Sequence, residues 1–171
     1  MTIPTEGRYV RESLSEISEM ALPLYANPLG NLLGGRVMHL VDIAGALAAM
    51  RHARCLVATA SVDYMTFLVP VRIGEMVILK AAVNRVFNTS MEVGVKVFVE
   101  NLRSGAVSHT SSAYLTFVAI DETGRRIPVV PVIPETHDEI RRWHKAGERR
   151  SVRLEIRKKY QAPAPPATGS D

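Results

Sequence analysis

The chain has 171 residues but a single cysteine, Cys55, so it cannot form an intrachain disulfide. One thiolate also makes a cysteine-based metal cluster implausible, and we expect neither a metal ion nor a cofactor. The longest apolar stretches fall well short of the roughly 20 residues that cross a bilayer, and the N-terminus has no secretory pattern. These absences predict a cytoplasmic protein in a reducing compartment that contacts no membrane.

Net positive charge is confined to one segment. Residues 141–159 carry nine lysines and arginines against Glu148 and Glu155, whereas residues 1–140 carry twelve basic and fourteen acidic side chains. A nucleic-acid-binding domain usually presents basic and aromatic side chains on its folded body, so we expect no nucleic-acid partner. The basic segment is interpreted first as a solvated helix, with contact to a phosphate-bearing ligand as the alternative.

The length and the 47% apolar content favour one folded domain over residues 1–160. Thr136 and Glu139 have the spacing of a capping box, which predicts a polar C-terminal helix over about residues 137–158. Residues 161–171 are rich in proline, and we expect this tail to be disordered.

One long apolar helix is predicted from Arg36 to Arg51, because apolar residues recur there at helical spacing. Strand patterns follow at Val57–Leu68, Met76–Phe87, Glu92–Glu100 and Ala106–Ile120, separated by turn signals. Residues 9–20 fit a strand or a helix. Long strands in hairpin succession predict an α+β fold in which a curved antiparallel sheet wraps around the apolar helix and encloses it.

Two features at the helix suggest chemistry on a carbonyl group. Gly34 and Gly35 place free backbone N–H groups and the positive end of the helix dipole where a ligand can come close. Asp42 lies seven residues further, and a carboxylate buried in an apolar helix needs a partner or a function. Asn27 begins the preceding loop, and the residues alone favour a turn-forming role for it.

The motif Asn27-x-x-Gly30-x-x-x-Gly34-Gly35, the Asp seven residues later, and the stretch Ser-Val-Asp-Tyr-Met-Thr-Phe-Leu from Ser61 resemble the hotdog-fold acyl-CoA thioesterases. The most similar branch is that of the brain-type acyl-CoA hydrolases and the YciA-type enzymes. The resemblance covers roughly residues 15–125. Many members have a histidine before the glycine pair, where this chain has Leu33.

The resemblance implies that the chain hydrolyses acyl-CoA to coenzyme A and a carboxylic acid. Asn27 and Asp42 would be the essential side chains, and the N–H groups of Gly34 or Gly35 would stabilise the tetrahedral oxyanion. Asp42 would act either as a base on water or as a nucleophile, and both remain open.

Gly35 and Asp42 lie about two turns, or roughly 10 Å, apart along one helix, too far to contact the same carbonyl. The site is therefore expected between two subunits, with Asp42 of one facing the glycines and Asn27 of the other. A homodimer would be the minimal unit, and a tetramer or hexamer its further assembly.

Further candidates concern binding rather than chemistry. The coenzyme A phosphates would be met by the turn Asn88-Thr89-Ser90 and by Arg51, Arg85 and the basic C-terminal helix. Met65, Phe67 and Phe87 would line the acyl channel, although large apolar residues on strands are usually core. His39 and His52 are interpreted as structural.

Alternative classes are a non-catalytic acyl-CoA sensor, a hotdog hydratase or dehydratase, and a phenylacetyl-CoA-type thioesterase. A hydratase needs a catalytic histidine at the helix entry, where this chain has Leu-Leu-Gly-Gly. Asp42 argues against the sensor, and only substrate assays separate the two kinds of thioesterase.

Overall fold

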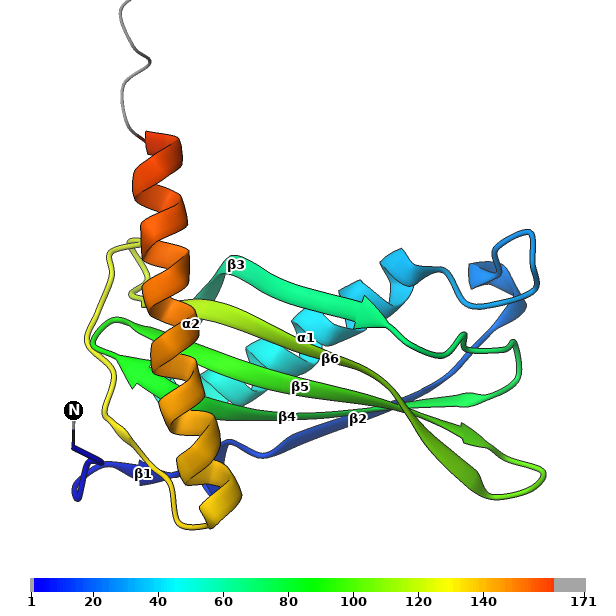
Figure 1. Cartoon of the computed structure of the whole chain (residues 1–171), viewed down its shortest axis with the longest axis horizontal. Coiled ribbons are helices and arrows are strands. Elements are labelled where there is room, and N and C mark those ends of the chain that lie inside the picture. Colours follow the sequence, from blue (N-terminus) through cyan, green and yellow to red (C-terminus); the bar gives the residue numbers. More distant parts are fainter. Residues whose placement is uncertain (1, 162–171) are drawn as a thin grey trace, which may run out of the picture.

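The computed structural model describes residues 2–161 and centres on a five-stranded antiparallel sheet (Figure 1). The strand order is β2-β4-β5-β6-β3. The strands are β2 Ser15–Met20, β3 Leu56–Phe67, β4 Met76–Phe87, β5 Ser90–Asn101 and β6 Ala106–Ile120. Two short strands, β1 Arg8–Tyr9 and β7 Val132–Ile133, pair in parallel beside this sheet.

Two long helices lie on opposite faces of the sheet, α1 (Gly34–Ala53) behind it and α2 (His137–Gln161) across its front in Figure 1. The α+β hotdog fold with a C-terminal helix is thus confirmed. Within residues 2–161 no helix is both long and apolar enough to cross a bilayer. The expected disordered tail lies outside the described residues, apart from Gln161, which is the last residue of α2.

Several bounds differ from the predicted ones by a few residues. Helix α1 begins at Gly34 and ends at Ala53, so it is longer at both ends than predicted, and β5 begins at Ser90 rather than Glu92. The N-terminal stretch that fitted either strand or helix forms a 3₁₀ turn, Val10–Ser13, followed by β2. Strands β4 and β6 have the predicted bounds.

The core lies between α1 and the inner face of the sheet, which we define as the face toward α1. Alternate residues of the central strands point inward, such as Leu79, Val93 and Phe117, each fully buried. Helix and sheet approach so closely that a Cβ on Gly45 would lie 2.9 Å from Phe117 Cε2. A glycine is therefore required at this crossing.

In the single chain the sheet covers one side of the apolar helix α1 and leaves the opposite side exposed. Met38, Ile43 and Met50, on the side of α1 away from the sheet, remain 48%, 37% and 37% exposed. Strand β3 lies at the edge of the sheet, and none of its twelve residues is buried. One apolar helix face and one long strand edge are thus left uncovered.

Helix α2 covers part of the outer face, which we define as the face away from α1. Its Trp143 and Ala146 are buried, and the Arg149 guanidinium binds both carboxylate oxygens of the fully buried Glu92 on β5, at 3.0 and 2.7 Å. Arg153 pairs with Asp63 on β3. The interpretation of this segment as a solvated helix is therefore wrong for its sheet-facing side.

Candidate active site

The first turn of α1 presents donors without acceptors. Leu33 occupies the N-cap position and gives no side-chain cap, while its carbonyl accepts the N–H groups of Arg36 and Val37 at 3.0 and 3.3 Å. No residue from 2 to 161 accepts a hydrogen bond from the N–H groups of Gly34 and Gly35. A Cβ on Gly35 would meet no atom within 4 Å, so a ligand can approach this backbone directly.

Asn27 holds the loop before α1 in shape. Its Oδ1 accepts the backbone N–H groups of Leu29 and Asn31 at 2.9 and 3.1 Å, and its own N–H donates to the Asn31 carbonyl at 2.7 Å. The turn-forming role that the residues alone favoured is therefore confirmed. Because Oδ1 is held by the backbone, Nδ2 has a fixed orientation, and no described residue accepts its hydrogen bonds.

Asp42 is only partly buried in the single chain, which corrects the expectation of a carboxylate enclosed by an apolar helix. It lies on the uncovered side of α1, where Gly35 and His39 precede it at helical spacing. Its Oδ1 accepts the hydroxyl hydrogen bond of Thr59 at 2.7 Å. Water and a second chain can therefore still reach this carboxylate.

Thr59 is the site residue that sequence reasoning missed. It lies on β3 opposite Phe117, seventeen residues from the carboxylate that it binds. A threonine in a strand of β-branched residues carries no local signal of function. Only a prediction of the register of α1 against β3 would have found it.

Phe67 and Met65, predicted to line the acyl channel, differ in position. A Cβ on Gly34 would lie 3.5 Å from the Phe67 ring, so this half-exposed side chain stands beside the helix entry. Met65 packs against the core. Phe87 lies under α2, with the Arg150 guanidinium 4.4 Å from its ring, away from this entry.

The predicted phosphate contacts lie away from the start of α1. Asn88 and Thr89 form the two-residue turn between β4 and β5, with Asn88 in a left-handed conformation at φ 69°, and Ser90 accepts a hydrogen bond from Arg150 at 3.2 Å. Arg85 is buried under α2, with its guanidinium 3.6 Å from the Trp143 ring. The structure thus gives Arg85 a packing role instead of an exposed charge.

Burial, followed by the positive charge of Arg150, lowers the pKa of Arg85, and Glu92 opposes this shift. Arg51 lies in the last turn of α1 and donates to the Leu14 carbonyl. It is therefore at the opposite end of the helix from the glycine pair.

His52, interpreted as structural, is fully buried, and its Nε2 lies 2.9 Å from the Val130 carbonyl. Burial lowers the pKa of its imidazole, and the Val130 hydrogen bond opposes this only in part. Within residues 2–161 no three His, Cys, Asp or Glu side chains gather in a group that could hold a metal ion.

Comparison with known proteins assigns the family. The profile of the thioesterase superfamily matches residues 29–106. The uncharacterized acyl-CoA thioester hydrolase YkhA of Bacillus subtilis is 36% identical over 166 residues, 97% of this chain and 96% of that protein. Mouse acyl-coenzyme A thioesterase 11 is 39% identical over 139 residues, 81% of this chain but 23% of that protein. The chain therefore belongs to the thioesterase superfamily, and the resemblance seen in its motifs is confirmed.

Solved structures agree with this assignment. An acyl-CoA hydrolase of Staphylococcus aureus, in complex with butyryl coenzyme A and coenzyme A, is 29% identical with a TM-score of 0.85, covering 91% of this chain and 95% of that one. An apo hexameric acyl-CoA thioesterase is 36% identical with a TM-score of 0.84, covering 93% and 99%. The staphylococcal enzyme has also been solved with single alanine substitutions of an aspartate, a threonine and an asparagine.

Proposed function

We propose that the active site of this acyl-CoA thioesterase forms between two copies of the chain, joined along β3 and the uncovered face of α1. The main support for a shared site is that two surfaces, strand β3 and the side of α1 away from the sheet, stay exposed in the single chain. Val62 and Tyr64 on β3 are 47% and 65% exposed, beside the exposed Met38 and Ile43 of α1. A second copy related by a two-fold axis would cover all of them.

The roles in hydrolysis follow from charge. Attack on a thioester carbonyl develops negative charge on its oxygen, which the N–H groups of Gly34 and Gly35 and Asn27 Nδ2 would stabilise. Asp42 of the partner subunit would activate water or attack the carbonyl itself. The Thr59 hydroxyl holds Asp42 Oδ1 and so orients the other oxygen, which makes Thr59 a positioning residue.

The relatives support these assignments. The aspartate, threonine and asparagine replaced in the staphylococcal enzyme are the same residue types as Asp42, Thr59 and Asn27. Hexameric relatives favour three such dimers as the assembly, and a relative named as a cytosolic hydrolase favours the cytoplasm. The phosphate contacts of Asn88, Thr89 and Ser90 stay a prediction for the bound coenzyme A.

The first test follows free-thiol release from short, long and aromatic acyl-CoAs. Wild type should turn over at least one of them, whereas Asp42→Ala should be folded, assembled and inactive. Thr59→Val should lower kcat by about 10–100-fold with KM nearly unchanged, because a hydrogen bond to a charged group contributes about 1.5–3 kcal/mol. If wild type binds acyl-CoA but releases no free thiol from any of them, the chain would instead be a non-catalytic acyl-CoA sensor.

A mixing experiment tests the shared site. Asn27→Ala and Asp42→Ala are inactive alone, but a mixed dimer has one site with both residues intact if the site is shared. After random exchange half of the dimers are mixed, so activity should recover to about one quarter of wild type. A mixture that stays inactive although mass spectrometry shows mixed dimers would place both residues of one site on the same chain and refute the proposal.

A further inference from the structure

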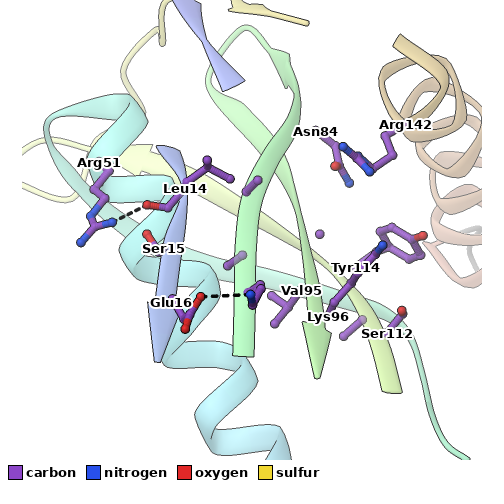
Figure 2. A pocket seen from close by; sticks show the side chains of 15 residues that line it. Leu14, Ser15, Glu16, Arg51, Asn84, Val95, Lys96, Ser112, Tyr114 and Arg142 are labelled. Carbon is purple, nitrogen blue, oxygen red and sulfur yellow. Dashed lines mark hydrogen bonds and ion pairs between the residues drawn. The ribbon is translucent and has the colours of Figure 1, made fainter. Parts of the chain in front are cut away.

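A groove of about 670 Å³ runs across the outer face of the sheet, between β2 and α2 (Figure 2). Small residues on neighbouring strands line it, with Ala82 of β4 directly opposite Gly94 of β5. Helix α1 packs on the other face, so the sheet separates this groove from Gly35 and Asp42 of the same chain. None of the residues to which we assign a role in the chemistry of hydrolysis lines it.

Basic side chains dominate the groove. It is lined by Lys80, Lys96, Arg51 and Arg142, and within residues 2–161 Glu16 is the one acidic residue that lines it. Glu16 lies 3.4 Å from Lys80 Nζ at the β2 side, as the dashed line in Figure 2 marks. The lining therefore carries excess positive charge.

Two of these cations lie side by side on neighbouring strands, on the same face of the sheet. Lys80 on β4 and Lys96 on β5 are direct register partners, so their side chains rise from the same outer face. Like charges in this arrangement destabilise an antiparallel pair. A bound anion between them would remove the repulsion.

Arg142 adds a third cation from α2, and Figure 2 shows it beside Asn84 at the groove. Its side chain is partly buried, yet among residues 2–161 neither Arg142 nor Lys96 has a carboxylate within ion-pair distance. Arg149 and Arg153 of the same helix are paired with Glu92 and Asp63. Helix α2 thus provides two of its arginines with carboxylate partners on the sheet, but not Arg142, which lines the groove.

We propose that this groove binds a phosphate-bearing small molecule of nucleoside-diphosphate size, with its phosphates between Lys80, Lys96 and Arg142. Pockets for ligands of this size measure about 300–1,000 Å³, which the groove matches. Ser112 and Tyr114 add hydroxyl groups for the rest of the ligand. A free nucleotide and the head group of coenzyme A share this chemistry, and the second source rests on the proposed function.

The test titrates ADP and coenzyme A separately into the full-length protein by calorimetry at constant ionic strength. Lys96→Gln and Arg142→Gln should each weaken binding at least tenfold. Lys145→Gln removes an exposed lysine that pairs with Glu148 on α2, and should change nothing. Without ligand and at low salt, Lys96→Gln should also melt at a higher temperature than wild type, since it relieves the repulsion from Lys80.

The outcomes separate the two sources. Tenfold weaker ADP binding with an unchanged KM for acyl-CoA supports a free nucleotide, whereas a KM that rises with the loss of coenzyme A binding supports the substrate's head group. If the wild-type protein hydrolyses no acyl-CoA but binds ADP, and the groove variants weaken that binding, the result would support the phosphate site in the groove and refute only the proposed function.

The proposal is overturned if neither probe binds wild type at millimolar concentration, or if both groove variants bind as wild type does. It is also overturned if Arg142→Gln changes the oligomer mass in light scattering while wild type binds neither probe. The groove would then be a contact between subunits.

Discussion

Replacing Arg149 by alanine should destabilise the packing of α2 on the sheet, because it removes the partner of a fully buried carboxylate. Breaking a buried ion pair destabilises a protein by about 3–5 kcal/mol. Glu92 has no exposed surface, but the Arg149 side chain is 24% exposed, and Asn84 still donates to Glu92 Oε1 at 3.0 Å. With this residual hydrogen bond and some solvent screening, we expect a loss of about 2–3 kcal/mol.

The charge of Arg149 does not depend on the assay pH. Burial alone would lower the pKa of its guanidinium, but the hydrogen bonds and negative charge of Glu92 outweigh burial and raise the pKa instead. The pair therefore stays ionised on the arginine side, and the measured loss reports the missing contact rather than a titration.

The assay is urea unfolding followed by the fluorescence of Trp143, the only tryptophan of the chain, which lies buried in α2. Arg141→Ala is the matched control, because Arg141 lies on the same helix and its pair with Asp138 is 63% and 71% exposed. Such a surface pair contributes about 0.2–1 kcal/mol. If Arg149→Ala loses no more stability than Arg141→Ala, the reasoning about the buried pair is refuted.

Three further predictions concern single positions. Gly35→Ala should raise the free energy of unfolding by up to about 1 kcal/mol, because the added Cβ would meet no atom within 4 Å. The same methyl group would crowd the N–H groups at the start of α1 and should lower kcat/KM by about 10–100-fold. A fully active variant would contradict this prediction. Gly94→Ala should cost about 1–3 kcal/mol in thermal unfolding, because its Cβ would lie 2.8 Å from Asn84 Nδ2, and an unchanged Tm would contradict it. His52 has its pKa lowered in the folded state, so the unfolded chain binds more protons and stability should fall as the pH drops below about 6.5. Urea midpoints at pH 7.5 and 5.5 should show a smaller fall for His52→Gln than for wild type, and equal falls would exclude His52 as the cause.

Local patterns predicted the strands well where alternation and turn signals coincide. Strand β4 ends at Phe87 because Asn88 takes a left-handed conformation, and Ser90 pairs with Phe87 at once. The same tight turn explains why β5 starts two residues earlier than predicted. Helix α1 starts two residues earlier than predicted, at Gly34. Glycine is a poor helix former, so the prediction placed the start after the glycine pair. The first turn of a helix tolerates glycine, because the N–H groups there have no acceptor within the helix in any case.

Contacts between distant segments could not be predicted. Glu92 alternates with Gly94 and Lys96 on a strand, a pattern that is typical of a solvated face, yet Arg149 lies 57 residues away and buries it. Thr59 and Asp42 meet only because β3 and α1 pack in one particular register. Charge and spacing along the chain carry no information on either pairing.

Because side chains alternate along β5, residues that pack against α1 and residues that line the outer groove lie on opposite faces of the sheet. Val95 points inward to the crossing of α1 with the sheet, where a Cβ on Gly45 would lie 3.7 Å from it, while its neighbour Lys96 points into the outer groove. Neighbours in a strand share backbone but not side-chain contacts. A polar substitution at Lys96 therefore leaves the packing that positions Gly35 and Asp42 unchanged, and its effects on phosphate binding can be measured with kcat intact.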